Sequence, residues 1–410
     1  MRDCRGLLNW VGLWCVCLIV FSGCALRITP TPEPVTIHFV NATFESDIEL
    51  YEEWAEDFHE RYPHITVEVH RWQPWAGADR DDVDVIAVNG GRIDELREAE
   101  TIVPLNPYLQ ADEGFDLEDL HAESLEHFSY EGERWAIPAG MTVSAMWYNR
   151  DLFDEYGVSY PEPGWTWDDF LEKAVALRDP GAGVYGYATG EGGFDTIAFI
   201  YQHGGRIVDD LYEPEQVVLD DPLTVEALEW YAQLIHDYEA VMTPERARVE
   251  HSVYDPIIGV VVGKVGMWMD SLAGTREVKL ALDWGVAPLP QDVRFFTPAS
   301  IYGYAMSAQT AYPDESWKWI SFLSEQIHPG LVPARMSVLE SEEYEDRVGV
   351  QVVDVAWVSF EEAETISYWR LFTGFQREMR AFGRAVEDII EGEITAQEGM
   401  ERAQREARGQ

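Results

Sequence analysis

Residues 35–69, VTIHFVNATFESDIELYEEWAEDFHERYPHITVEV, decide the fold class. The apolar run at 35–40 predicts a buried strand, and the alternation at 65–69 predicts a second one. Between them, residues 46–62 have the three- and four-residue spacing of a helix with one apolar face. That face carries Tyr51, Trp54, Ala55, Phe58 and Tyr62. With a further apolar strand at 83–88, this order is typical of an α/β fold with a parallel sheet, whose strands end in cleft-forming loops.

The same alternation of short apolar runs and amphipathic stretches continues to the C-terminus. Strands are predicted at 265–269 and 285–288, and helices at 170–178, 223–238, 313–323 and 375–390. Length alone suggests two or three domains, but the composition shows no interdomain linker. We therefore expect the chain to pass between domains within strands or helices.

The N-terminus is typical of an exported protein. All four cysteines lie in the first 24 residues, at Cys4, Cys15, Cys17 and Cys24. A charged start, an apolar stretch at 7–21 and small residues at 22–23 are typical of a secretion signal. The stretch is shorter than the roughly 20 residues that a membrane-spanning helix needs.

Residues 21–24, FSGC, resemble a bacterial lipobox. This resemblance implies that residues 1–23 are a lipoprotein signal peptide and that Cys24 is the lipidated N-terminus of the mature protein. Residues 24–34, with the run TPTPEP, then form an extended tether outside the cell membrane, in the periplasm or on the outer face. The alternatives are an ordinary secretion signal and an uncleaved short anchor.

The charge balance excludes some functions. The 410 residues contain 75 acidic and 29 basic side chains, a net charge of −46. Binding to nucleic acid or to anionic lipid through a basic patch is disfavoured, because attraction to phosphate is the main source of such affinity. Adaptation to a saline habitat and an ordinary acidic exported protein both fit this composition.

Motifs with catalytic or cofactor chemistry are not supported by their context. Residues 181–186, GAGVYG, fit a dinucleotide fingerprint, but a helix precedes them and a strand follows. His59, His64 and His70 lack the helical i, i+4 spacing of a metal site, so surface or packing roles are favoured and no metal is expected. No G-x-S-x-G motif and no cysteine after Cys24 supply a nucleophile. The sequence therefore favours binding over catalysis, with no cofactor.

The sixteen tryptophans favour a carbohydrate ligand. Flat aromatic faces suit the apolar faces of sugar rings, while carboxylates and amides bind the hydroxyl groups. A role in the core is the alternative for each tryptophan.

Several collinear segments resemble the family 1 extracellular solute-binding proteins, which deliver sugars to ABC importers. They are WAIP at 135–138, WYNRDLF at 147–153, TWDDF at 166–170, VDVI at 83–86, GKVGMWMD at 263–270, WGVAPLP at 284–290, residues 317–323 and the tail at 392–404. Together these segments span nearly all of the chain after the tether.

The resemblance implies two lobes joined by crossing strands, with solute held in a cleft that closes over it. Lobe 1 would take residues 35–141 and 289–325, and lobe 2 residues 142–288 and 326–410. The implied partners are a mono- or oligosaccharide and the permease subunits of an ABC transporter, with the binding protein a monomer. An exported lipid-anchored glycoside hydrolase, or the ligand-binding component of a sensor, is the alternative.

The family's ligand-binding positions carry over to one set of residues. These are Asn41, Phe44, Glu45, Trp72, Trp75, Asn89, Thr142, Phe194, Asp195, Asp270 and Tyr302, and Trp369 would add an aromatic surface from another direction. Ala273 and Met379 stand where maltodextrin-binding members stack two tryptophans on the ligand. The resemblance therefore disfavours maltodextrin as the ligand.

Overall fold

A computed structural model describes residues 33–41, 43, 47–71, 83–190, 195–211, 214–253, 255–273, 282–367 and 374–409. Several sequence predictions lie outside these residues: the signal peptide, Cys24 and the greater part of the tether, together with Phe44, Glu45, Trp72, Trp75, Phe194 and Trp369.

The fold begins with the predicted strand–helix–strand unit. β1 (Val35–Asn41) is followed by α1 (Ile48–Arg61) and β2 (Ile65–Arg71), and β3 (Val85–Asn89) comes next. β1 pairs in parallel with β2 on one side and with β3 on the other. The predicted parallel α/β arrangement is therefore confirmed.

Short elements then lead to a long central strand. They are η2 (Gly90–Arg92), α2 (Ile93–Glu98), β4 (Ile102–Val103), α3 (Asn106–Ala111), α4 (Ala122–His127), β5 (Ser129–Tyr130) and β6 (Glu133–Arg134). The central strand is β7 (Ile137–Asn149).

The next part of the chain is largely helical. It comprises α5 (Arg150–Tyr156), α6 (Trp167–Leu177), β8 (Tyr185–Ala188), α7 (Thr196–Gln202), α8 (Pro222–His236), β9 (Val241–Met242), α9 (Pro244–His251), α10 (Ile257–Val261), β10 (Val265–Ser271) and β11 (Trp284–Ala287). Thr166 and Asp169 form a full capping box at the start of α6, which explains why that helix begins there.

The C-terminal third begins with a second long strand and is otherwise mostly helical. It comprises β12 (Phe296–Ser307), α11 (Pro313–Leu323), β13 (Val332–Pro333), α12 (Met336–Leu339), α13 (Glu342–Val348), α14 (Val350–Glu362), β14 (Glu364–Ser367), α16 (Gln376–Ile390) and α17 (Ala396–Ala407). Thr395 and Glu398 close a capping box before α17.

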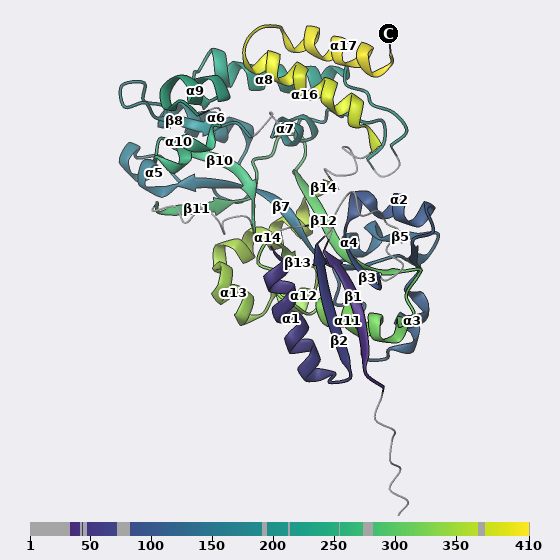
Figure 1. Ribbon diagram of the computed structural model, residues 1–410. Coiled ribbons are helices and arrows are strands. Elements are labelled where there is room, and N and C mark those ends of the chain that lie inside the picture. Colours follow the sequence, from purple (N-terminus) through teal and green to yellow (C-terminus); the bar gives the residue numbers. More distant parts are fainter. Residues whose placement is uncertain are drawn as a thin grey trace, which may run out of the picture.

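One sheet joins two lobes. Its strands lie in the order β2-β1-β3-β12-β7-β10-β8-β9. The long strands β7 and β12 are antiparallel neighbours, and they run from the lower lobe of Figure 1 into the upper one. The chain thus passes between the lobes inside strands, as we expected from the absence of an interdomain linker in the composition.

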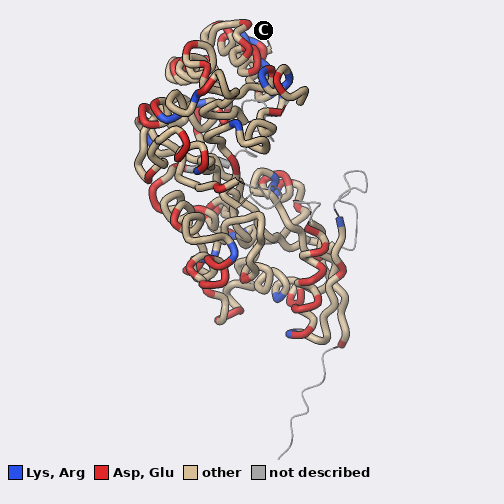
Figure 2. Tube along the Cα trace, turned by 90° about the vertical axis from the view of Figure 1, so that its left-hand side faces the viewer, with Lys and Arg blue, Asp and Glu red and all other residues tan. Residues whose placement is uncertain are grey.

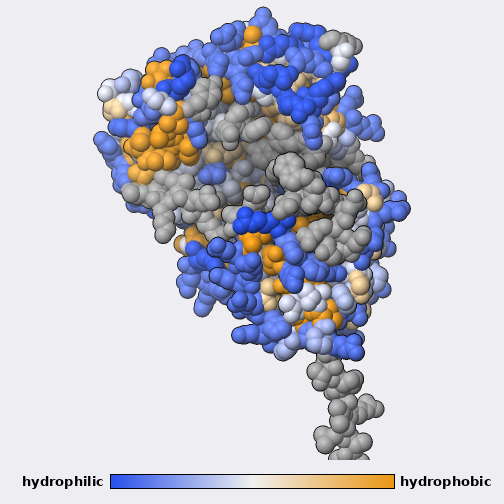
Figure 3. All heavy atoms as spheres, viewed as in Figure 1, coloured by the Kyte–Doolittle hydropathy of each residue, from blue (hydrophilic) through white to orange (hydrophobic). Residues whose placement is uncertain are grey.

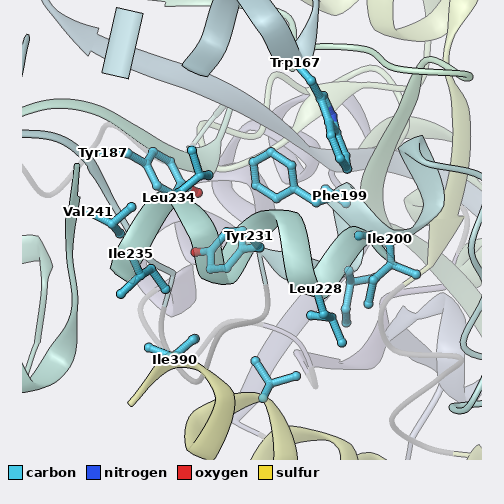
Figure 4. Packing of buried hydrophobic residues seen from close by; sticks show 14 of the residues in the cluster. Trp167, Tyr187, Phe199, Ile200, Leu228, Tyr231, Leu234, Ile235, Val241 and Ile390 are labelled. Atoms are coloured by element: carbon cyan, nitrogen blue, oxygen red, sulfur yellow. The ribbon is translucent and has the colours of Figure 1, made fainter. Parts of the chain in front are cut away.

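Each lobe has its own core on the same face of the sheet. In the first lobe, Phe39 of β1 packs against Tyr51 of α1 and Trp319 of α11. In the second lobe, Phe199 of α7 packs against Trp167 of α6 and Tyr231 of α8, as Figure 4 shows. A third core on the opposite face includes α14 and continues behind both lobes.

The residues that follow the predicted lobe boundary at residue 289 have second-lobe contacts. Phe296, at the start of β12, stacks on Tyr201 of α7, and the Gln202 amide donates to the Phe296 carbonyl. Residues 289–296 therefore pack in the second lobe, and the chain crosses within β12, where Ala299 lies opposite Val143 of β7. Composition gave no sign of this crossing, because it lies inside a strand that is buried along its whole length.

Two residues that follow the second predicted boundary, at residue 326, have contacts with the first lobe. Arg335 is 6% exposed and bonds to Ser324, to Asp119 and to the carbonyl of Asp116, all in or beside the first lobe. His328 Nε2 lies 3.0 Å from Asp47 Oδ2 at the start of α1. Leu331 and Ala334 also belong to the first-lobe core.

The surface is acidic and largely hydrophilic. Figure 2 shows acidic residues spread over both lobes, with few basic ones among them. Figure 3 shows a mostly hydrophilic face with an apolar patch in the region of α10, where Val261 and Val262 are exposed. Within the described residues, no helix is both long enough and apolar enough to cross a bilayer.

Candidate functional site

Polar residues line one face of the sheet where the two lobes meet. Residues paired across neighbouring strands point to the same face, and successive residues of a strand point to opposite faces. In the register of the sheet, Tyr302 of β12 pairs with Asn89 of β3 and with Gly140 of β7, and Ser300 pairs with Thr142. Ser271 of β10 pairs with Ser144 of β7. Asn41 of β1 pairs with Ala87, two residues before Asn89, and so shares their face.

We call this set the polar strip. It consists of Asn41, Asn89, Ser300, Tyr302, Thr142, Ser144 and Ser271.

The polar strip lies between the two lobe cores. On the same face, Phe39 of β1 belongs to the first-lobe core, and Met146 and Tyr148 of β7 belong to the second-lobe core. The intervening Thr142 and Ser144 are only partly buried, whereas their neighbour Val143, on the opposite face, is fully buried. The face thus changes from apolar under the first-lobe helices to polar in the strip, and back to apolar under the second-lobe helices.

The opposite face is closed at this position. Met141, Val143 and Ile301 belong to a core that also contains Val352 and Val355 of α14. A ligand held between the lobes therefore meets the polar face of the crossing strands.

Asn89 carries the most informative group of the strip. Its Oδ1 accepts a hydrogen bond of 2.8 Å from the Gly91 backbone N–H and fixes the turn into η2. Its Nδ2 is buried and has no hydrogen-bond partner among the described residues. A buried donor without a partner is costly, so the Asn89 amide is suited to bind an acceptor oxygen.

Asn41 shapes the loop that follows β1. Its side chain is buried, and its Oδ1 accepts hydrogen bonds from the backbone N–H of Thr43, at 3.0 Å, and from the Thr43 hydroxyl, at 2.8 Å. The residue thus orders the chain at the edge of the strip.

The crossing strand β7 packs closely against β13, which pairs with it in the sheet. A Cβ added to Gly140 would lie 2.4 Å from the Val332 carbonyl oxygen of β13. Only glycine allows this approach, which holds β13 against β7 directly beside Tyr302.

Two predicted residues do not join the strip. Asp270 pairs with Ala145, so it lies on the opposite face of β10 from Ser271. It is exposed, although desolvation by the surrounding protein raises the pKa of its carboxyl. The sequence placed it at the end of the correct strand but could not fix the face, which depends on a one-residue register.

Asp195 lies in the second-lobe interior. The side chain is 3% exposed, and its Oδ2 accepts hydrogen bonds from the hydroxyls of Tyr187, at 2.7 Å, and Tyr231, at 2.6 Å. Burial raises the pKa of the Asp195 carboxyl. This arrangement shows that Asp195 helps to hold α7 and α8 on β8, and the ligand contact expected for it stays a prediction.

The structure therefore brings together four of the predicted positions, Asn41, Asn89, Thr142 and Tyr302. It adds Ser144, Ser271 and Ser300, which the sequence analysis missed. The signal for Ser144 was present, because it follows Thr142 by two residues on a strand and so shares its face. Ser271 and Ser300 could be assigned to this face only from the pairing of their strands with β7.

The three histidines considered as a metal group do not come together as such. The His59 Nδ1 lies 2.6 Å from the carbonyl of Ile65. His70 instead lies beside His38 and Glu68. This second group lies on the sheet face opposite to Asn41, away from the polar strip.

Comparison with known proteins agrees with this geometry. A model of the bacterial extracellular solute-binding proteins matches residues 41–326. The chain belongs to this family. The family and its structural neighbours reported below are binding proteins.

Curated relatives match part of the chain. A mannitol-binding protein of Pseudomonas aeruginosa is 25% identical over 239 residues, which is 55% of this chain and 52% of the relative. An arabinooligosaccharide-binding protein of Halalkalibacterium halodurans is 28% identical over 118 residues, 28% of this chain and 26% of the relative. The chain thus spans about half the length of the mannitol-binding relative and about a quarter of the other.

Solved structures match nearly the whole chain. An ABC substrate-binding protein of Listeria monocytogenes in complex with cycloalternan has a TM-score of 0.75 at 19% identity, covering 92% of this chain and 99% of that one. The sugar-binding protein MalE of Xanthomonas citri has a TM-score of 0.75 at 18% identity, covering 91% and 96%. These neighbours establish the two-lobed fold.

Proposed function

We propose that this protein binds a carbohydrate, a mono- or oligosaccharide, in the cleft between its lobes and delivers it to an ABC-type permease. The observation that carries the proposal is the polar strip, which lies on the crossing strands between the two lobe cores. Its hydroxyl and amide groups donate and accept hydrogen bonds, as the hydroxyls of a sugar require. The names of the relatives, which bind mannitol and arabinooligosaccharides, support the same ligand class.

A glycoside hydrolase fits this site less well. Such an enzyme uses two carboxyl groups separated by roughly 5 to 9 Å across the bound sugar. The polar strip, drawn from the described residues, consists of amides and hydroxyls, and Asp270 lies on the other face of its strand. We therefore retain binding as the function.

A thermal-shift screen of the purified protein against mono- and oligosaccharides and sugar alcohols tests the ligand class. A sugar present at 100 times its dissociation constant stabilises the fold by about 2.7 kcal/mol. We expect a small, chemically related subset to raise the melting temperature. Stabilisation by no sugar or sugar alcohol would contradict the proposal, and release of reducing ends from glycans would favour the hydrolase.

Delivery to a permease is tested in cells. Deletion of the gene should abolish uptake of the labelled sugar, and a plasmid copy should restore uptake. Unchanged uptake with loss of a transcriptional response to the sugar would show that the protein serves a sensor.

We further propose that Cys24 anchors the protein outside the cell membrane through a lipid. Its place between the signal-like segment and the TPTPEP run supports this proposal. Two or more acyl chains hold a protein stably on a bilayer. Cys24→Ser should release the protein into the soluble extracytoplasmic fraction, whereas Cys17→Ser should not. Wild-type membrane retention of the Cys24 variant would disprove the anchor.

A further inference from the structure

Two histidines and a glutamate gather on the edge of the first-lobe sheet. β2 is the edge strand of the sheet order, and β1 is its neighbour. His38 of β1 pairs with Glu68 of β2, and His70 follows Glu68 by two residues, so all three side chains point to one face. Phe39, in contrast, points to the face that α1 covers.

The potential ligand atoms of this group are close together. His38 Nδ1 lies 2.9 Å from His70 Nε2 and 3.6 Å from Glu68 Oε2. One ligand atom from each of the three residues lies within 4.8 Å of the others. A metal ion bound at about 2.0 to 2.2 Å holds tetrahedral ligand atoms about 3.3 to 3.6 Å apart. The distance from His38 to Glu68 matches this range, and the distance from His38 to His70 is shorter.

The strands hold the group in place. β1 and β2 are paired over seven residues, Val35 to Asn41 with Ile65 to Arg71, so the backbone fixes the spacing of the three side chains. The backbone N–H of His38 also donates to the Asp84 carboxylate at 2.8 Å. A preformed site of this kind needs only small side-chain movements to close around an ion.

Solvent can reach the group. The side chains of His38 and Glu68 are 25% and 56% exposed, so an ion has a path to the imidazole nitrogens. The net charge of −46 raises the local concentration of cations around the whole molecule.

We propose that His38, Glu68 and His70 bind a divalent transition-metal ion, for which Zn²⁺ is the best match. Two imidazole nitrogens and one carboxylate oxygen suit Zn²⁺, Ni²⁺ or Cu²⁺, whereas Mg²⁺ and Ca²⁺ prefer oxygen ligands alone. The ion ties the edge strand β2 to β1 and leaves a coordination position for water. This site faces away from the polar strip and is independent of the proposed sugar binding.

The alternative arrangement has no metal. The rings of His38 and His70 are stacked, with centroids 5.2 Å apart and planes at 29°. A hydrogen bond between two neutral imidazoles then accounts for the nitrogen–nitrogen distance. The two arrangements differ in whether the native protein takes up an ion stoichiometrically.

Calorimetric titration and thermal shift of the chelator-treated full-length protein with ZnCl₂ decide between them. We expect one Zn²⁺ per chain and a rise in melting temperature, with no comparable rise from CaCl₂ or MgCl₂. His70→Gln and Glu68→Gln should weaken Zn²⁺ binding at least tenfold, while a matched control, His64→Gln, should bind as the wild type does.

The melting temperatures of the metal-free variants separate lost binding from misfolding. Glu68 is exposed, so Glu68→Gln should keep the metal-free melting temperature of the wild type. Absence of stoichiometric binding, equal stabilisation by Ca²⁺, or unchanged Zn²⁺ affinity in both variants would overturn the proposal. Equal weakening by His64→Gln would overturn the assignment to this group.

Discussion

Tyr302 of β12 lies directly opposite Asn89 of β3 and, on its other side, opposite Gly140 of β7. This one residue therefore connects the end of a first-lobe strand with the strand that crosses between the lobes. The register shifts immediately after it, between Tyr302 and Gly303. Such irregularities often lie next to functional sites, and this one lies within the polar strip.

The hydroxyls of the crossing strand should contribute to affinity and little to stability. In the double variant Thr142→Val/Ser144→Val, each lost hydrogen bond costs about 0.5 to 1.5 kcal/mol, so sugar affinity should fall about fivefold to a hundredfold. The melting temperature should change little, because both side chains are only partly buried. Calorimetric titration with the sugar found in the screen measures the first effect.

Thr66→Val is the matched control for that variant. It makes the same chemical change on the exposed edge strand β2, away from the polar strip. Equal affinity in the double variant and in the control would show that the strip does not contact the ligand.

Arg335 should be important for the stability of the first lobe. Its guanidinium is buried, bonds to Ser324 and Asp119, and lies 4.6 Å from the centre of the Phe115 ring. Removal of one partner of a buried ion pair costs about 3 to 5 kcal/mol. Arg335→Ala should therefore lower the free energy of unfolding by about 3 kcal/mol in urea denaturation. Exposed Arg377→Ala is the control, and equal losses in the two variants would refute the role of Arg335.

Stability should fall in mild acid because of His121. Desolvation lowers the pKa of its ring from the ordinary value of 6.5, and the ring packs on Phe360 of α14 at a centroid distance of 4.5 Å. The unfolded chain binds the proton more tightly than the folded chain does. The stabilising contribution of neutral His121 is therefore complete above pH 6.5 and is lost as the pH falls from there through the lowered folded-state pKa.

His121→Gln isolates this contribution. The variant should show a shallower decline of melting temperature below pH 6.5 than the wild type. A decline of equal slope in both proteins would assign the acid sensitivity to other groups.

The acidic surface should make stability depend on salt. With a net charge of −46, self-repulsion is screened over about 10 Å at 0.1 M salt and about 3 Å at 1 M. The melting temperature should therefore rise between these NaCl concentrations. A flat curve would show that the acidic side chains are already well separated or paired.

Much of the fold follows from local patterns. The helix face of Tyr51, Trp54 and Phe58 and the capping boxes of α6 and α17 are visible in the sequence because each depends on residues within one element. Lobe boundaries depend instead on which core accepts an apolar side chain. Phe296 and Arg335 are placed by partners 95 and 216 residues away, Tyr201 and Asp119, and no local pattern reports such contacts.

The candidate site could be predicted only in part, because some of its residues are placed by local patterns and others by the pairing of distant strands. Asn41 and Asn89 come at the ends of apolar strands. Their place at the carboxyl ends of the parallel strands could therefore be inferred from position alone. The faces of Asp270 and Ser271 differ by one residue of register, which only the pairing with β7 reveals. His38 and His70 are 32 positions apart in the sequence. They are adjacent in space because the parallel strands β1 and β2 bring them together.

The central claim, that a sugar binds on the polar strip between the lobes, is tested most directly at Asn89. Asn89→Asp keeps the oxygen that accepts from Gly91 but replaces the buried Nδ2 donor with an acceptor. Asn106→Asp, at a first-lobe position away from the strip, makes the same change in charge.

Calorimetric titration of the sugar into both variants is the decisive measurement. The account predicts that Asn89→Asp weakens binding at least tenfold with little loss of melting temperature, while Asn106→Asp binds as the wild type does. Wild-type affinity in Asn89→Asp would contradict it.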